Sequence, residues 1–175
     1  GFAYTDALNL KDISSAVNTA RSIARAQADV AGVNLKFNDK TGLYTPEDVL
    51  TGSENQAIIN MLNDMDALAR KQDQRVKKVI CSLVTSQEKI LVAASDGTLA
   101  TDIRPMVKLS IQVIVSDDKG RMEVGFAGGG GRVLLSKVFE TGFAEEFVSQ
   151  AVKSALVNLE AVAAPAGEMP VVLAS

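Results

Sequence analysis

The first helix of the chain is predicted by apolar residues that recur every three or four positions. Asn9 followed by Asp12 is typical of a helix N-cap with an acidic third residue, and the apolar spacing after it predicts a helix over 10–29. The next segment, 30–53, mixes Gly, Asn, Asp, Thr and Pro with isolated apolar residues. It is predicted to be a long irregular connection.

Two further helices are predicted by the same spacing. Ser53 and Gln56 form a capping-box pattern ahead of an apolar stripe, which predicts a helix over 54–73. A third stripe predicts a helix over 143–162 that ends before Pro165. The stripe of the second helix is expected to face the core through Met61, Leu62, Met65 and Leu68.

Strand-like alternation replaces helical spacing between residues 75 and 127. β-branched residues and turn signals there predict four antiparallel strands. We expect the connecting turns near Gln87, at Asp96 and Gly97, and over 117–120.

One face of this sheet is predicted to meet the helices. The odd positions of 107–115 are all apolar, whereas the even ones are mostly polar. The segment 169–174 is expected to add a final strand, and 133–140 is compatible with either a short helix or a strand. The predicted fold is α+β over residues 1–175 as a single domain, with an antiparallel sheet of about four to six strands and three helices packed mainly on one face.

Composition and charge narrow the function classes. The 175 residues are 47% hydrophobic and 22% charged, which is typical of a globular domain with a core. The formal net charge is -3 and the basic residues are dispersed, so we expect no nucleic-acid partner. We also expect no membrane span and no signal peptide, hence a cytoplasmic protein. The chain starts at Gly1 without Met and stops just after an apolar run, so we expect it to be a piece of a longer protein.

The residue types that are missing exclude most hydrolytic machinery within this chain. It has no histidine and a single cysteine, Cys81, so it contains neither a Ser-His-Asp or Cys-His pair nor a histidine or cysteine-rich metal site. Cys81 lies in line with apolar neighbours and is predicted to fill the core. We therefore expect most hydrolytic machinery to be absent from these residues.

The most unusual stretch is GFAGGGGR, in which Gly128, Gly129, Gly130 and Gly131 precede Arg132. It matches neither the P-loop nor the dinucleotide-binding pattern. One interpretation is a flexible loop or a strand bent by glycine. The other is a bare backbone edge on which an extended peptide pairs, with Arg132 available for a carboxylate or a backbone carbonyl.

A second polar cluster lies in SDGTLATDIRP. Asp96 is explained by its turn, while Asp102 and Arg104 are two residues apart on a strand and so share a face. A structural ion pair or a partner contact explains them. A catalytic role for Asp96, Asp102 and Arg104 is the alternative, and it requires measurable hydrolysis by the chain alone.

Three stretches together resemble the amino-terminal half of the TldD/PmbA family of metalloproteases, closest to the TldD branch. They are GFAYTDALNL, then ILVAASDGTLATDIRPMVKLSIQV, then GGGGR followed by ALVNLEAVAAPAGEMPVVLAS. The resemblance implies a cytosolic peptidase of unfolded or extended peptides, of the type linked to peptide maturation, antitoxin turnover and the name modulator of DNA gyrase. It also implies a zinc held by an H-E-x-x-x-H helix and a later cysteine, and pairing as homo- or heterodimers.

None of those zinc ligands has a counterpart in this chain, so the resemblance assigns no metal or catalytic residue to it. What it implies here is a substrate-side and dimerisation domain, inactive alone, next to a carboxy-terminal catalytic domain. The glycine run would then line the substrate channel. The alternative is a stand-alone α+β module that binds peptides or a partner without catalysis.

Overall fold

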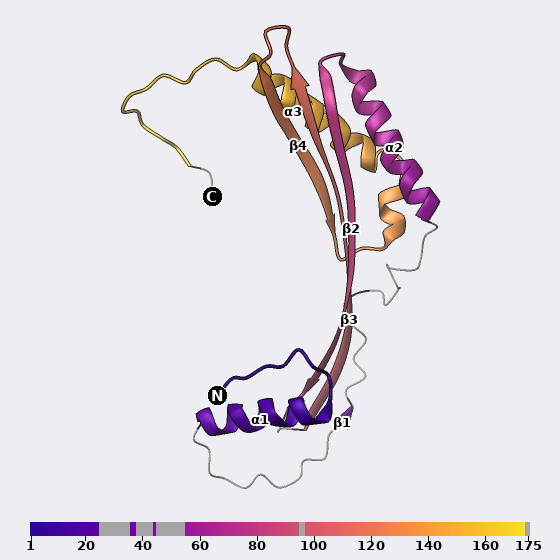
Figure 1. Cartoon of the computed structure of the whole chain (residues 1–175), viewed down its shortest axis with the longest axis vertical. Helices are drawn as coiled ribbons and strands as arrows, with labels where there is room; N and C mark the ends of the chain where they lie inside the picture. Colours follow the sequence, from indigo (N-terminus) through magenta and orange to yellow (C-terminus); the bar gives the residue numbers. More distant parts are fainter. Residues whose placement is uncertain (25–35, 38–43, 45–54, 95–96, 174–175) are drawn as a thin grey trace.

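The chain folds around a sheet of long antiparallel strands (Figure 1). The computed structural model describes residues 1–24, 36–37, 44, 55–94 and 97–173. β3 is central, β2 pairs with one of its edges and β4 with the other, and the short β1 pairs in parallel with the start of β3. The strands are β1 (Lys36–Phe37), β2 (Val76–Ala93), β3 (Thr98–Ser116) and β4 (Met122–Gly131).

Four strands are predicted between residues 75 and 127, but the structure has three there, because β2 is continuous. The turn expected near Gln87 is wrong: Gln87 pairs with Pro105 and Glu88 with Arg104 in an unbroken register. This segment contains no Gly, Pro or Asn to supply turn geometry. Its polar residues lie where the two-stranded β2–β3 ribbon extends past the end of β4 toward α1 (Figure 1).

The other two turns agree with the sequence. Gly97 has φ 95° and its amide donates to the Ala94 carbonyl at 3.1 Å. In the β3–β4 turn, Gly120 has φ 83°, and the Asp117 carboxylate accepts the Lys119 and Arg121 amides at 2.9 and 2.8 Å. Asp96 lies outside the described residues.

Two helices cover one face of the sheet, and a third does not. α2 and α3 lie against β2, β3 and β4, while α1 lies at the distal end of the β2–β3 ribbon (Figure 1). The apolar side chains of α1 stay largely exposed, Leu10 at 85% and Val17 at 60%, so α1 departs from the predicted packing on the sheet. The helices are α1 (Leu10–Ala24), α2 (Asn55–Gln72), the 3-10 helix η1 (Leu135–Phe139) and α3 (Phe143–Glu160).

Helix starts follow the expected chemistry where the structure describes them. The Asp12 amide donates to Asn9 Oδ1 at 2.9 Å, which confirms the predicted N-cap of α1. At α3 the Gly142 amide donates to Glu145 Oε2 at 3.0 Å. The Ser53 half of the second predicted cap, and most of the connection over 30–53, lie outside the described residues.

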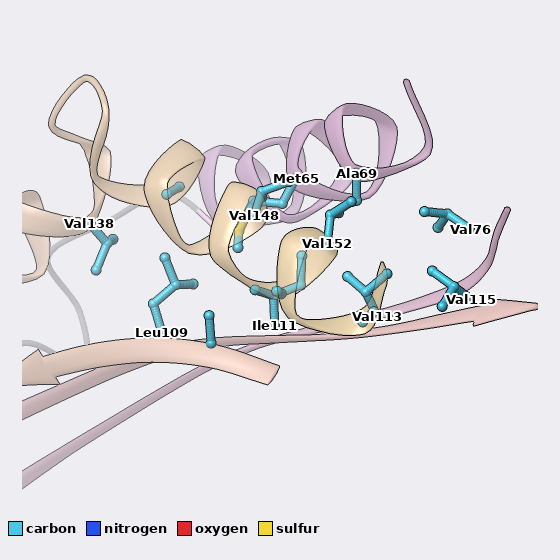
Figure 2. Packing of buried hydrophobic residues seen from close by; sticks show 14 of the residues in the cluster. Met65, Ala69, Val76, Leu109, Ile111, Val113, Val115, Val138, Val148 and Val152 are labelled. Atoms are coloured by element: carbon cyan, nitrogen blue, oxygen red, sulfur yellow. The ribbon is translucent and has the colours of Figure 1, made fainter. Parts of the chain in front are cut away.

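The core lies between the sheet and the two packed helices. Figure 2 shows the odd residues of β3 pointing at Met65 and Ala69 of α2 and at Val148 and Val152 of α3. This confirms both the predicted sheet face and the core role of helix two. The five odd residues of the stretch 107–115 are completely buried: Val107, Leu109, Ile111, Val113 and Val115.

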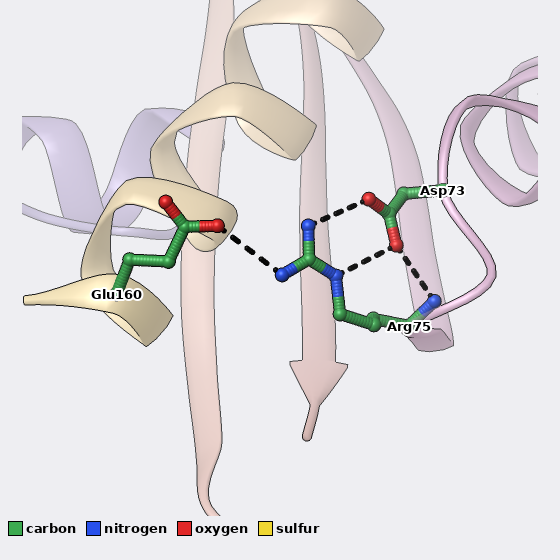
Figure 3. Close-up of polar contacts among 3 residues, drawn as sticks. All are labelled: Asp73, Arg75 and Glu160. Atoms are coloured by element: carbon green, nitrogen blue, oxygen red, sulfur yellow. Dashed lines mark hydrogen bonds and ion pairs between the residues drawn. The ribbon is translucent and has the colours of Figure 1, made fainter. Parts of the chain in front are cut away.

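A charged cluster joins the start of β2 to the end of α3 (Figure 3). Arg75 donates to Asp73 at 2.9 Å and lies 3.2 Å from Glu160. Side-chain and backbone hydrogen bonds from Arg75 lower the pKa of Asp73. The cluster therefore links the end of α3 to the start of β2 through an exposed ion pair.

The segment after α3 carries no strand in its described part. The predicted strand at 169–174 is wrong over 169–173, where Val172 is 97% exposed. Apolar residues favour an extended conformation, but a strand needs a neighbour to satisfy its backbone, and no described residue pairs with this segment.

Candidate functional site

The glycine run is the last part of strand β4. Gly128, Gly129, Gly130 and Gly131 pair in register with residues 110 down to 107 of β3. It is therefore an ordered strand within the sheet.

Two hydrogen bonds show which backbone groups of β4 face outward. The Asp117 amide donates to the Arg121 carbonyl at 3.1 Å, so odd residues of this strand direct their backbone toward β3. Asn158 Nδ2 of α3 donates to the Val124 carbonyl at 3.0 Å from the opposite side. Even residues of β4 therefore direct their amides and carbonyls away from the sheet.

The outward groups beyond Val124 belong to Phe126, Gly128 and Gly130. β4 pairs with β3 alone, and no described strand pairs with this outer edge. An unpaired row of alternating donors and acceptors is what an added strand needs. The edge therefore supplies main-chain pairing sites next to a stretch without side chains.

Pro105 coincides with the end of this pairing. The β3–β4 ladder stops at the pair of Val107 and Gly131. Pro105 has the same parity as Val107, so its nitrogen faces the side of β4, where a proline has no hydrogen to donate. No bond to β4 is lost at this position, and the glycine run is the distal end of the usable edge.

The fold itself requires glycine at several of these positions. A Cβ on Gly129 would lie 2.7 Å from Phe147 Cζ of α3, and one on Gly128 would lie 2.6 Å from the Leu109 carbonyl oxygen. Gly130 has φ 151°, and its Cβ would lie 2.0 Å from the Val107 oxygen. Close packing by α3 and β3 therefore accounts for much of the glycine content.

Arg132 points across the open face of the sheet. Its Nη1 lies 3.7 Å from Glu88 Oε2, and its guanidinium lies 5.5 Å from the Tyr44 ring centroid. The Arg132 side chain is 28% exposed, whereas Glu88 is 62% exposed. A carboxylate ligand would compete with Glu88 for this guanidinium, so the predicted role of Arg132 in substrate binding stays a prediction.

Asp102 and Arg104 form the predicted ion pair. Arg104 Nε donates to Asp102 Oδ2 at 2.8 Å, and this hydrogen bond raises the pKa of Arg104. The second oxygen, Asp102 Oδ1, is buried without a partner among the described residues. The two residues lie on the part of β3 that extends beyond the end of β4.

Cys81 packs against the core, as predicted, and burial raises its pKa to about 11, with a smaller effect from the Asp66 charge. A neutral thiol of this kind is a poor metal ligand. No cluster of three potential metal-binding residues occurs in the part of the chain that the structure describes. The described residues therefore offer no site for a zinc ion. None of the described helices has the length and apolar character needed to cross a membrane.

Sequence reasoning missed three residues that shape this edge. Asn158 donates a hydrogen bond to the Val124 carbonyl, Phe147 lies over Gly129, and Phe126 is a 62% exposed aromatic on the edge itself. For Asn158, a polar residue near the end of an apolar helix stripe was the only signal. Phe126 follows the alternation of β4 and could have been placed on the open face.

Comparison with known proteins places these features in a family. Residues 50–159 match the family model described as PmbA/TldA metallopeptidase central domain. The chain is 41% identical to a protein of Haemophilus influenzae named metalloprotease TldD homolog, across 99% of this chain and 37% of the relative. A protein of the same name from Buchnera aphidicola subsp. Schizaphis graminum is 35% identical, over 100% of this chain and 37% of the relative. The chain thus spans little more than a third of these curated relatives, and it belongs to the PmbA/TldD family of metallopeptidases.

Proposed function

We propose that this chain is the substrate-side part of a TldD-like metallopeptidase and holds extended peptides by main-chain pairing along the outer edge of β4. The observation that carries the proposal is the row of backbone groups at Phe126, Gly128 and Gly130, with which no described strand pairs. Main-chain pairing gives affinity that depends little on peptide sequence. That suits a peptidase of unfolded or extended substrates.

The rest of the proposed activity is inferred from the relatives of this chain. Because the relatives named as metalloproteases are much longer, we assign zinc-dependent cleavage to residues outside this chain. The chain alone should therefore bind peptides without cutting them. A carboxy-terminal catalytic domain, and a second family member in a homo- or heterodimer, complete the proposed assembly.

Hydrogen exchange measured by NMR tests the edge directly. The probe is the peptide Ac-Lys-Thr-Ser-Phe-Ser-Thr-Lys-NH2, added to the isotope-labelled chain at millimolar concentration. The amides of Phe126 and Gly128 face outward, so they should exchange fast in the free chain and slow down with peptide. The amides of Ala127 and Gly129 face β3, so they should be protected from the start and serve as internal controls.

Two versions of the peptide, N-methylated at complementary sets of alternate residues, sharpen the result. In a paired strand only one set of amides faces β4, so one version should lose binding and the other should keep it. Protection that appears elsewhere in the chain, or equal effects of the two versions, would contradict the proposal. Valine at Gly129 or Gly130 is a poorer test, because the added atoms would collide with Phe147 or the Val107 oxygen and disturb the fold.

A further inference from the structure

The free part of the β4 edge begins at a defined residue. The Val124 carbonyl is already occupied by Asn158 at 3.0 Å. A peptide that pairs with the outer edge therefore finds its first fully available amide and carbonyl at Phe126, followed by those of Gly128. The register of an added strand is limited at this end by Asn158 and at the other by the end of β4 at Gly131.

Phe126 is also the one aromatic side chain on this stretch of the edge. It projects from the open face of the sheet, opposite the helices, because it pairs with Gln112 of β3 and the core residues of β3 are odd. Its side chain is 62% exposed, and Val124 beside it on the same face is 42% exposed. After Phe126 the strand offers Gly128 and Gly130 on that face, with no side chain at all.

We infer that Phe126 is a specificity-determining residue, which favours peptides with a large apolar side chain at the position paired with it. This inference rests on the proposed function of the edge. In an added strand, the residue directly opposite Phe126 points to the same face with its Cβ within contact distance, where aromatic and aliphatic pairs attract. The positions opposite Gly128 and Gly130 meet no side chain and accept any residue.

The expected substrate class is therefore an extended peptide with one aromatic or large aliphatic residue, followed or preceded by residues whose side chains are not selected. Cross-strand pairs of this kind change a binding constant by about two- to fivefold relative to small residues. The selection is mild because one face of the pair stays in water.

The test compares three peptides on three proteins. The peptides are Ac-Lys-Thr-Ser-Xaa-Ser-Thr-Lys-NH2 with phenylalanine, leucine or serine as Xaa, titrated into the labelled chain and followed by the Gly128 amide shift. The proteins are the unchanged chain, Phe126→Ala and Val84→Ala. Val84 is the matched control because it is 56% exposed on the same open face but lies in β2, on the far side of β3 from the edge.

The unchanged chain and Val84→Ala should bind the phenylalanine and leucine peptides about two- to fivefold more tightly than the serine peptide, and Phe126→Ala should bind all three alike. Equal affinities for the unchanged chain, or a preference that survives in Phe126→Ala, would overturn this inference while leaving the edge proposal intact. Absence of any peptide-dependent shift at Gly128 would overturn both.

Discussion

Replacing Gly125 by alanine tests the close approach of two backbones where α3 crosses β4. A Cβ on Gly125 would lie 2.0 Å from the Ala151 oxygen and 2.5 Å from the Ala155 nitrogen. Both are backbone atoms of a helix, so no side-chain rotation can relieve the overlap and α3 has to move away from the sheet. Because overpacking of a core costs about 1–3 kcal/mol when side chains can adjust, we expect Gly125→Ala to lower the free energy of unfolding by about 3 kcal/mol or more.

Gly120→Ala is the matched control for this experiment. Gly120 has φ 83° but nothing within 4 Å of its missing Cβ, so only the left-handed conformation is penalised, by about 1 kcal/mol. Urea unfolding followed by circular dichroism, with the slope checked for each variant, gives both values. Equal losses for the two variants, or a Gly125→Ala protein within about 0.5 kcal/mol of the unchanged chain, would refute the packing of α3 on β4.

Two further predictions concern ionisable groups. Since hydrogen bonds from Arg75 lower the pKa of Asp73, its carboxylate stabilises the fold above the unfolded-state pKa of about 3.9 and loses that effect as the pH falls through the lower folded-state value. Asp73→Asn should therefore have a lower Tm than the unchanged chain at neutral pH, and the two Tm values should converge in acid. A Tm difference that stays constant with pH would contradict this. The second group is the Cys81 thiol, whose pKa is raised by burial to about 11. Iodoacetamide at pH 8 should therefore alkylate the folded chain about a hundredfold more slowly than the urea-unfolded chain. Equal rates would show that the thiol is not buried as described.

Local periodicity predicted the part of the fold in which one face of an element is buried. The alternation over 107–115 fixed the inner face of β3, and the stripe around Met65 fixed the inner face of α2, because burial leaves only one compatible side. The same reasoning failed for α1, whose apolar stripe includes Leu10 and Val17 at 85% and 60% exposure. An amphipathic pattern indicates that one helix face packs against an apolar surface, but it does not identify which part of the protein supplies that surface.

The errors at Gln87 and at 169–173 have a common physical origin. A polar stretch without glycine or proline continues a strand when a neighbour is available, as β3 is for β2. An apolar stretch stays irregular when no neighbour is available, as for the segment after α3 among the described residues. Pairing between distant segments decided both cases, and a single sequence window carries no information about pairing.

The location of the candidate site was predictable, but its working surface was not. Four adjacent glycines mark the place by composition alone. Which of their backbone groups face outward depends on the parity of the β3–β4 ladder, and where the free edge begins depends on Asn158, which is 34 residues away from Val124. Neither can be read before the strands are paired.

The structure separates two reasons for glycine that the sequence presents as one. Phe147 of α3 and the Val107 oxygen of β3 each occupy the space of a side chain at Gly129 and Gly130, so folding alone selects glycine there. Peptide pairing, in contrast, needs only the amides and carbonyls of even residues, which any residue type other than proline provides. Loss of function after substitution in the run would therefore follow from a disturbed fold as readily as from a blocked edge. The decisive observations are those that leave the protein unchanged, namely the protection of the Phe126 and Gly128 amides and the effect of methyl groups placed on the peptide.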